Sequence, residues 1–197
     1  MHHLCLMSVF CIATILAPIS AGAAIVVALD EASLVERADT VALGTVVHTT
    51  VEVGPRGGIV THARIQVGRA LKGSAAGAVL DVLVPGGILP SGRGSRVAGA
   101  PSLRSGDVVL GFFEARETHQ VPWGLSFGLL RVSGNPASGF RVTRDVRGLS
   151  LVGASGGPVS ASSVAIVDEP LDQLWRRLEH YRRQPLGVPA RDEGGIR

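Results

Sequence analysis

The stretch from Thr40 to Val53 constrains the fold most strongly, because its residues alternate with a period of two along the whole length. Such alternation of β-branched and polar residues is typical of a half-buried β-strand. Gly44 lies inside the run and indicates a bend or a close approach of the backbone, as where a strand curls around a barrel. The face expected to point into the core carries Val41, Leu43, Thr45, Val47, Thr49, Val51 and Val53.

A short helix is predicted directly before this strand, from Asp30 to Ala38. The Asp30 carboxylate can accept hydrogen bonds from the free N–H groups of the first turn, so this residue is the expected N-cap. Leu29 and Leu34 are spaced for a hydrophobic staple around the cap. Leu34, Val35 and Ala38 form one apolar face, through which the helix can pack on the rest of the protein.

Further strands follow along the chain, and turns at 54–58 and 134–136 join two pairs of them into hairpins. The stretch from Asp107 to Ala115 is apolar on both faces and is expected to be the most buried strand. The pattern predicts a mainly β protein, a small antiparallel barrel of five or six strands with one helix at each end. The other expected strands are Ile59–Leu71, Val79–Pro85, Leu125–Val132, Phe140–Thr143 and Leu149–Val152.

The C-terminal part of the chain predicts an amphipathic helix from Leu171 to Gln184, which Pro185 ends. Its apolar stripe can dock on the protein's own barrel, the interpretation that we favour, or lie on an anionic membrane surface. The stripe consists of Leu171, Leu174, Trp175, Leu178 and Tyr181. The predicted divisions are a signal peptide at 1–23, a barrel domain at 29–152, a Gly/Ser-rich linker at 153–169, the helix at 170–185 and a disordered tail at 186–197.

Residues 1–23 resemble a secretory signal peptide, because the apolar run Leu4–Ile19 precedes a small-residue cleavage pattern at 21–23. We therefore expect an exported protein, periplasmic or extracellular. The first residues include no Lys or Arg, and the apolar run continues to Ala28, so an uncleaved membrane anchor is the alternative. Both cysteines of the chain lie inside this segment, so the processed protein has neither a disulfide nor a thiolate metal site.

The net charge of +3 does not indicate nucleic-acid binding, because no basic stretch is interleaved with aromatic residues. All but one of the 19 Lys and Arg residues are Arg, the exception being Lys72. Arg93, Arg96 and Arg104 lie in a long Gly- and Ser-rich segment, Gly86–Gly106. Segments of this length are either functional or poorly ordered. We expect an excursion without defined structure, and the alternative is a ligand-binding rim of the kind that OB-type barrels use.

Several motifs resemble those of a family of uncharacterised exported bacterial proteins. They are SLVERADTVALGTVV, a strand ending in RALKG, then PGG, GAPSLRSGDVVLGFF and GLSFGLLRV. The resemblance covers about residues 29–152. The order of elements is also similar to the netrin-like fold of the tissue inhibitors of metalloproteinases, which is an OB-type barrel.

The two resemblances imply an OB-like, netrin-like barrel, and they imply no site residue. The metalloproteinase inhibitors chelate zinc through an N-terminal cysteine and contain many disulfides. Because the processed chain has no cysteine, that inhibitory mechanism cannot carry over. The family of exported bacterial proteins provides no catalytic residue to transfer.

Ser155 lies in Gly153–Val159, which resembles the G-D/N-S-G-G-P motif around the nucleophile of chymotrypsin-like proteases. Such a serine needs a histidine base and an acid that orients the histidine. The same residues match G-x-S-x-G, and Asp168 and His180 follow in the order used by α/β-hydrolases. The interpretation that we favour is a linker, since strands that should accompany either motif are missing. The upstream residues that could complete a triad are His48, His62, Asp81 and Asp107.

His48, His62 and Glu52 share the outer face of two strands that the turn at 54–58 pairs. In that register His62 opposes Thr50, and His48 is a diagonal neighbour. Two histidines and a carboxylate can bind a divalent metal. However, Arg64 would oppose His48 and repel a cation, so we expect ordinary polar side chains on a solvated face.

The sequence therefore predicts a monomeric, non-enzymatic binding module of the cell envelope, whose partner is an unknown protein or ligand. No cofactor and no nucleic acid are expected. Membrane contact is expected only through an uncleaved signal or the C-terminal helix. The alternative function is that of a serine hydrolase acting through Ser155.

Overall fold

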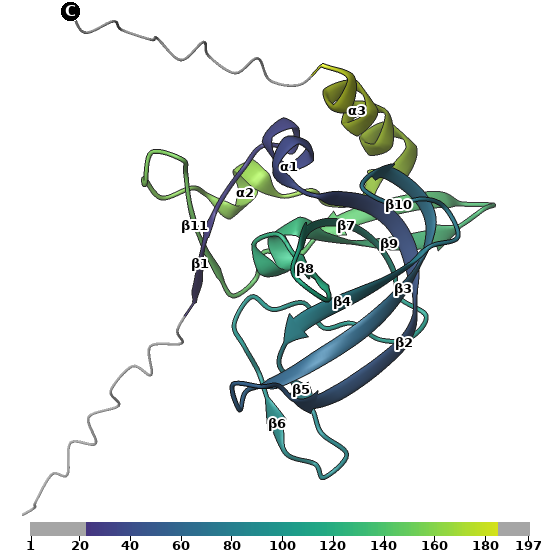
Figure 1. The fold of residues 1–197 in the computed structure, drawn as a ribbon. Coiled ribbons are helices and arrows are strands. Elements are labelled where there is room, and N and C mark those ends of the chain that lie inside the picture. The colour runs from purple at the N-terminus through teal and green to yellow at the C-terminus, as the bar shows by residue number, and fades with distance from the viewer. Residues whose placement is uncertain (1–22, 185–197) are drawn as a thin grey trace, which may run out of the picture.

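A computed structural model describes residues 23–184 and shows a mainly β protein with a closed five-stranded barrel and three α-helices (Figure 1). Residues 1–22 of the predicted signal peptide and the predicted tail at 186–197 lie outside the described residues. The elements are β1 Ala24–Val27, α1 Glu31–Arg37, β2 Thr40–Val53, β3 Ile59–Lys72, β4 Val79–Pro85, β5 Gly87–Ile88, β6 Gly94–Ser95, β7 Val108–Ala115, β8 Gln120–Pro122, the 3-10 helix η1 Leu125–Gly128, β9 Leu129–Asn135, β10 Gly139–Arg144, β11 Leu149–Val152, α2 Ala161–Val164, β12 Glu169–Pro170 and α3 Leu171–Arg183.

The barrel closes through the short strand β8, which the sequence analysis did not predict. The strands lie in the order β7-β2-β3-β4-β8, and β8 also pairs with β7. On the β4 side the pairing is parallel and consists of one register pair, Val82 with Gln120. This arrangement is compatible with an OB-like barrel. Closure matters because strands paired on both sides offer no free edge to other chains.

Two stretches near the ends of the predicted barrel have other roles in the structure. The stretch expected to begin a strand at Leu125 begins with η1 instead, and the strand starts at Leu129. β11 pairs with β1 in a separate parallel sheet and does not join the barrel. β1 is therefore part of the fold, although its residues continue the apolar run of the signal peptide. Among residues 23–184, no helix has both the length and the apolar character needed to cross a membrane.

β2 buries different faces in its two halves, so the prediction of one inward odd face is wrong for the first half. Ala42 and Val46 point into the barrel core, whereas Val47 is 47% exposed. A register shift between Val46 and His48 inserts an extra residue, as in a β-bulge. Because an extra residue reverses the alternation, the odd positions beyond the shift point inward.

The protein has two hydrophobic cores, one on each side of the barrel wall. One fills the barrel with side chains from β2, β3, β4 and β7. The other lies between the outer wall and the helices α1 and α3, which Figure 1 shows together at the upper end of the molecule. Leu174, Trp175 and Leu178 of α3 are buried there, so docking on the protein's own barrel is confirmed. β7, from Val108 to Ala115, contributes to both cores, as expected for the most buried strand.

An ion-pair network ties α3 to α1. Asp30 caps α1 as predicted, because its carboxylate accepts from the Ser33 N–H at 2.7 Å. Arg177 of α3 pairs with Glu169 and with Glu31 of α1, the Nη2–Oε1 distance to Glu31 being 2.8 Å. The hydrogen bonds that Arg177 donates to Glu169 and then to Glu31 raise its pKa above the usual range. One half-buried guanidinium thus joins α3 and the adjoining β12 to α1, which is distant in sequence.

Gly44 lies at a close contact between β2 and β3, as its position in the sequence predicted. A Cβ atom there would lie 2.5 Å from the Gln66 carbonyl oxygen and 2.7 Å from Cγ2 of Ile65. A register shift between Leu43 and Gly44 marks the same place in the ladder. The missing side chain lets the two strands approach and coil, which barrel closure requires.

Gly44→Ala is expected to lower the free energy of unfolding by about 1–3 kcal/mol, the usual cost of overpacking a close contact. Gly58→Ala is the matched control, because a Cβ atom at Gly58 would meet no atom within 4 Å. Urea denaturation followed by tryptophan fluorescence measures both variants. Equal stability of the two variants would contradict the steric role assigned to Gly44.

Candidate functional site

The segment Gly86–Gly106 is tied to the barrel at several points, so the expectation of an excursion without defined structure is wrong. The Thr61 hydroxyl donates to the Gly86 carbonyl at 2.7 Å. The Ser126 N–H donates to the Gly99 carbonyl at 3.0 Å. These contacts fix the beginning of the segment on β3 and its middle on η1.

The end of the segment is anchored on β2. The Ser105 hydroxyl donates to the Val47 carbonyl at 2.9 Å, and the Gly106 N–H donates to the Val46 carbonyl at 2.8 Å. Leu103 is buried in the barrel core. Between the anchors, β5 and β6 form a small hairpin that Figure 1 shows at the lower end of the molecule, away from α1 and α3.

A hollow of about 810 Å³ lies between this segment and the end of the barrel. We call it the mouth groove. One wall comes from the end of β2, the start of β3 and the end of β4, and the other from the segment itself. Its lining residues are Thr49, Val51, Thr61, Pro85, Gly86, Gly87, Ile88, Gly94, Ser95, Arg96, Val97, Ala100, Pro101, Ser102, Leu103 and Arg104.

The lining of the mouth groove contains two arginines and no acidic residue. Within residues 23–184, neither Arg96 nor Arg104 has a carboxylate within the 4.0 Å of an ion pair. Arg93 lies on the adjacent β5–β6 hairpin and is also exposed and without an acidic neighbour at that distance. The groove is therefore electropositive, and its charges are available to a ligand.

A second hollow, of about 570 Å³, lies on the other side of residues 96–102 and differs in its electrostatics. Its two further arginines are already paired. Arg131 contacts Asp107 at 3.0 Å, and Arg147 contacts Asp145 at 2.8 Å. Hydrogen bonds from Arg147 lower the pKa of Asp145. Because these charges compensate one another, the mouth groove is the stronger candidate for binding an anion.

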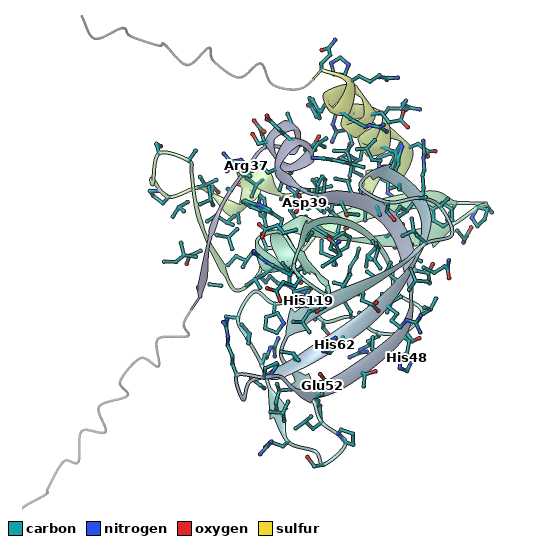
Figure 2. All side chains as sticks on the ribbon, in the orientation of Figure 1. Arg37, Asp39, His48, Glu52, His62 and His119 are labelled. Carbon is teal, nitrogen blue, oxygen red and sulfur yellow. The ribbon has the colours of Figure 1, made fainter. Side chains whose placement is uncertain are left out.

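The two histidines on the β2–β3 hairpin lie in the predicted register, with His62 opposite Thr50 and His48 opposite Arg64 (Figure 2). Each takes a different partner. Nε2 of His48 lies 3.1 Å from the Thr50 hydroxyl, and Nε2 of His62 lies 3.1 Å from Oε1 of Glu52. In the described part of the chain, no three histidine, cysteine or acidic side chains are grouped so that they could hold a metal ion.

Ser155 lies in an exposed turn that follows β11. The Gly153 N–H donates to the Gly157 carbonyl at 2.7 Å, and Gly156 has a φ of +85°, so the turn is held by its backbone. Figure 1 shows β11 beside β1, and Figure 2 shows His48 and His62 on the β2–β3 hairpin. In the described residues, no histidine side chain forms a hydrogen bond with the Ser155 hydroxyl.

The acids that could complete a triad with Ser155 contact arginines instead. Asp168 pairs with Arg141 at 2.7 Å. Asp107 accepts from Arg131, and Asp81 lies 3.8 Å from Arg64. The structure thus brings none of the predicted triad members together.

The sequence analysis missed Arg144, which is 6% exposed and lines a hollow of about 540 Å³ between the start of α1, the region of α2 and α3. Its guanidinium lies 4.6 Å from the ring centre of Phe127, and Nη1 donates to the Val164 carbonyl at 3.0 Å. Burial lowers its pKa to about 10. The period-two pattern of β10 could have identified it, because Arg144 shares a strand face with the buried Val142.

Comparison with known proteins finds no family model that matches this chain and no curated protein with significant similarity to it. The resemblance to exported bacterial proteins therefore rests on the quoted motifs. The site has to be argued from its own residues.

A fluorophosphonate serine probe is expected to leave the purified protein unlabelled, because no histidine of the described chain hydrogen-bonds the Ser155 hydroxyl. Mass spectrometry of the probe-treated protein measures the adduct, with Ser155→Ala as the control. Labelling that disappears in Ser155→Ala would overturn this expectation and support the serine hydrolase.

Proposed function

We propose that the protein is an exported, non-enzymatic binding module of the cell envelope, and that its mouth groove binds an anionic partner. The observation that carries the proposal is the pair Arg96 and Arg104 in a lining without any carboxylate. Guanidinium groups bind carboxylates and phosphates strongly, because they present several N–H donors in a planar fork. A partner that supplies such groups would neutralise charges that the protein itself leaves uncompensated.

Two features support a binding module over an enzyme. His62 is paired with Glu52, His48 contacts the Thr50 hydroxyl, and the groove lining holds no nucleophile next to a base. The groove walls, in contrast, are held by backbone and side-chain anchors at both ends of the segment. A preformed site of this kind loses little conformational entropy when it binds.

Export and a netrin-like relationship belong to the same proposal and rest on the sequence. The apolar run before residue 24 and the motifs between residues 29 and 152 support them. The OB-like barrel is compatible with that relationship. An envelope location would place the groove where anionic proteins and surface polymers are available.

The test is fluorescence anisotropy with three labelled anionic probes, namely a glutamate-rich peptide, inorganic polyphosphate and a heparin oligosaccharide. We expect at least one to bind with a Kd that rises with salt, as screening requires. Arg96→Ala/Arg104→Ala should weaken that binding about tenfold or more, which corresponds to about 1.4 kcal/mol.

The matched control is Arg176→Ala/Arg182→Ala, which removes two exposed charges from α3. This variant should bind like the unchanged protein. Absence of binding by all three probes, or equal loss in the two double variants, would refute the mouth groove as an anion site.

A further inference from the structure

The end of β2 is an unpaired sheet edge beside the mouth groove. β2 pairs with β3 along its length as far as Val53, but with β7 only from Thr40 to Thr45. Val46 contacts Gly106 and Asp107, and the Val47 carbonyl accepts from the Ser105 hydroxyl. In the described part of the chain, no other strand pairs with residues 48–53 on the side away from β3.

The alternation of an antiparallel ladder identifies the free peptide groups of this edge. The Ile59 carbonyl accepts from the Gly86 N–H at 2.8 Å and therefore points away from β2. Val53 is the register partner of Ile59, so its own peptide groups point away from β3. Because the direction alternates along a strand, Val51 and Thr49 also turn their N–H and C=O groups outward.

These free groups adjoin the hollow that the arginines line. Thr49 and Val51 form part of one wall of the mouth groove, and Arg96 and Arg104 form part of the other. A chain that pairs with β2 would lie one strand spacing away, about 4.8 Å, and so would enter the groove. Its side chains would meet the guanidinium groups of the opposite wall.

We propose that the mouth groove binds an extended acidic peptide segment of a partner protein, which adds to β2 as a further strand along residues 49–53. The inference deepens the proposed function and rests on it. Backbone hydrogen bonds to the free groups of β2 provide affinity, and the arginines select for acidic side chains. The charge of the lining, which has no acid to oppose the arginines, points to this partner rather than to a second copy of the chain.

The edge also lacks the usual protection against such pairing. Natural sheets protect an edge with lysine, proline or a covering element. Residues 49–53 contain neither lysine nor proline, and Val53 is 46% exposed. Glu52 is the single charge in the stretch, and it contacts His62. An edge of this kind fits a role in recognition.

The probe is a labelled heptapeptide of alternating glutamate and valine, measured by fluorescence anisotropy against the unchanged protein. Two further versions carry N-methyl groups on alternate residues, one version on the odd and one on the even positions. In a peptide that pairs with β2, the N–H groups of either the odd or the even residues face β2, and the others face away. We expect one methylated peptide to lose binding at least tenfold and the other to bind within about threefold of the parent.

Val51→Pro tests the same contact from the protein side. The Val51 N–H does not serve the ladder with β3, so proline is tolerated there as on other sheet edges. We expect the far-UV circular dichroism to be retained and the binding of the parent peptide to fall at least tenfold. The methylated peptides keep the test decisive if this variant fails to fold.

The outcomes separate this inference from the proposed function. Equal binding of all three peptides, or binding of polyphosphate without binding of the parent peptide, would overturn strand addition and leave the anion site intact. Absence of any probe binding would overturn both. A dimer of the free protein that Val51→Pro dissociates would identify a second copy as the occupant and overturn the peptide assignment.

Discussion

The close approach of β2 and β3 at Gly44 is the constraint on which the rest of the barrel depends. Any side chain at position 44 would keep the two strands apart, because its Cβ atom would clash with the Gln66 carbonyl. Because position 44 is glycine and register shifts lie beside it, the long β2–β3 hairpin can coil. The coil brings β4 round to β8, and the barrel closes there with a single residue pair on that side. The absence of a side chain at Gly44 thus favours closure of the sheet between β4 and β8.

The mouth groove follows from a mismatch of strand lengths in the same barrel. β2 continues for several residues beyond its last register pair with β7 at Thr45. The chain between β4 and β7 must cross this gap, and it does so as the anchored segment from Gly86 to Gly106. The space between the segment and the free end of β2 is the groove. This acid-free, arginine-lined hollow is therefore a consequence of barrel geometry.

The helices stabilise the opposite end of the barrel by covering its outer wall. α1 and α3 meet over a core that includes Trp175 and Leu178, and Arg177 links both to β12. Residues 153–169, expected to be a linker, contribute α2 and β12 to this arrangement. The helical end is thus occupied with the protein's own contacts, which leaves the mouth end free for binding.

Local patterns predicted the parts of the fold that depend on neighbouring residues. The cap at Asp30, the register of His62 with Thr50 and the buried stripe around Trp175 all follow from short-range spacing, and each is present. The inward face of β2 was predicted only for its second half, because the shift at Val46 is set by pairing with β3. β8 escaped prediction because three residues are too few to show a period.

The sequence by itself determined the mainly β class, the two principal helices and the alternation that places apolar side chains in the cores. These depend on hydrophobic periodicity and capping, which act within a few residues. Only the tertiary structure decided that the Gly86–Gly106 segment is ordered, that Arg96 and Arg104 face a hollow without acids, and that no histidine among residues 23–184 hydrogen-bonds Ser155. Those features require groups far apart in the chain to meet, and their positions depend on how the barrel closes.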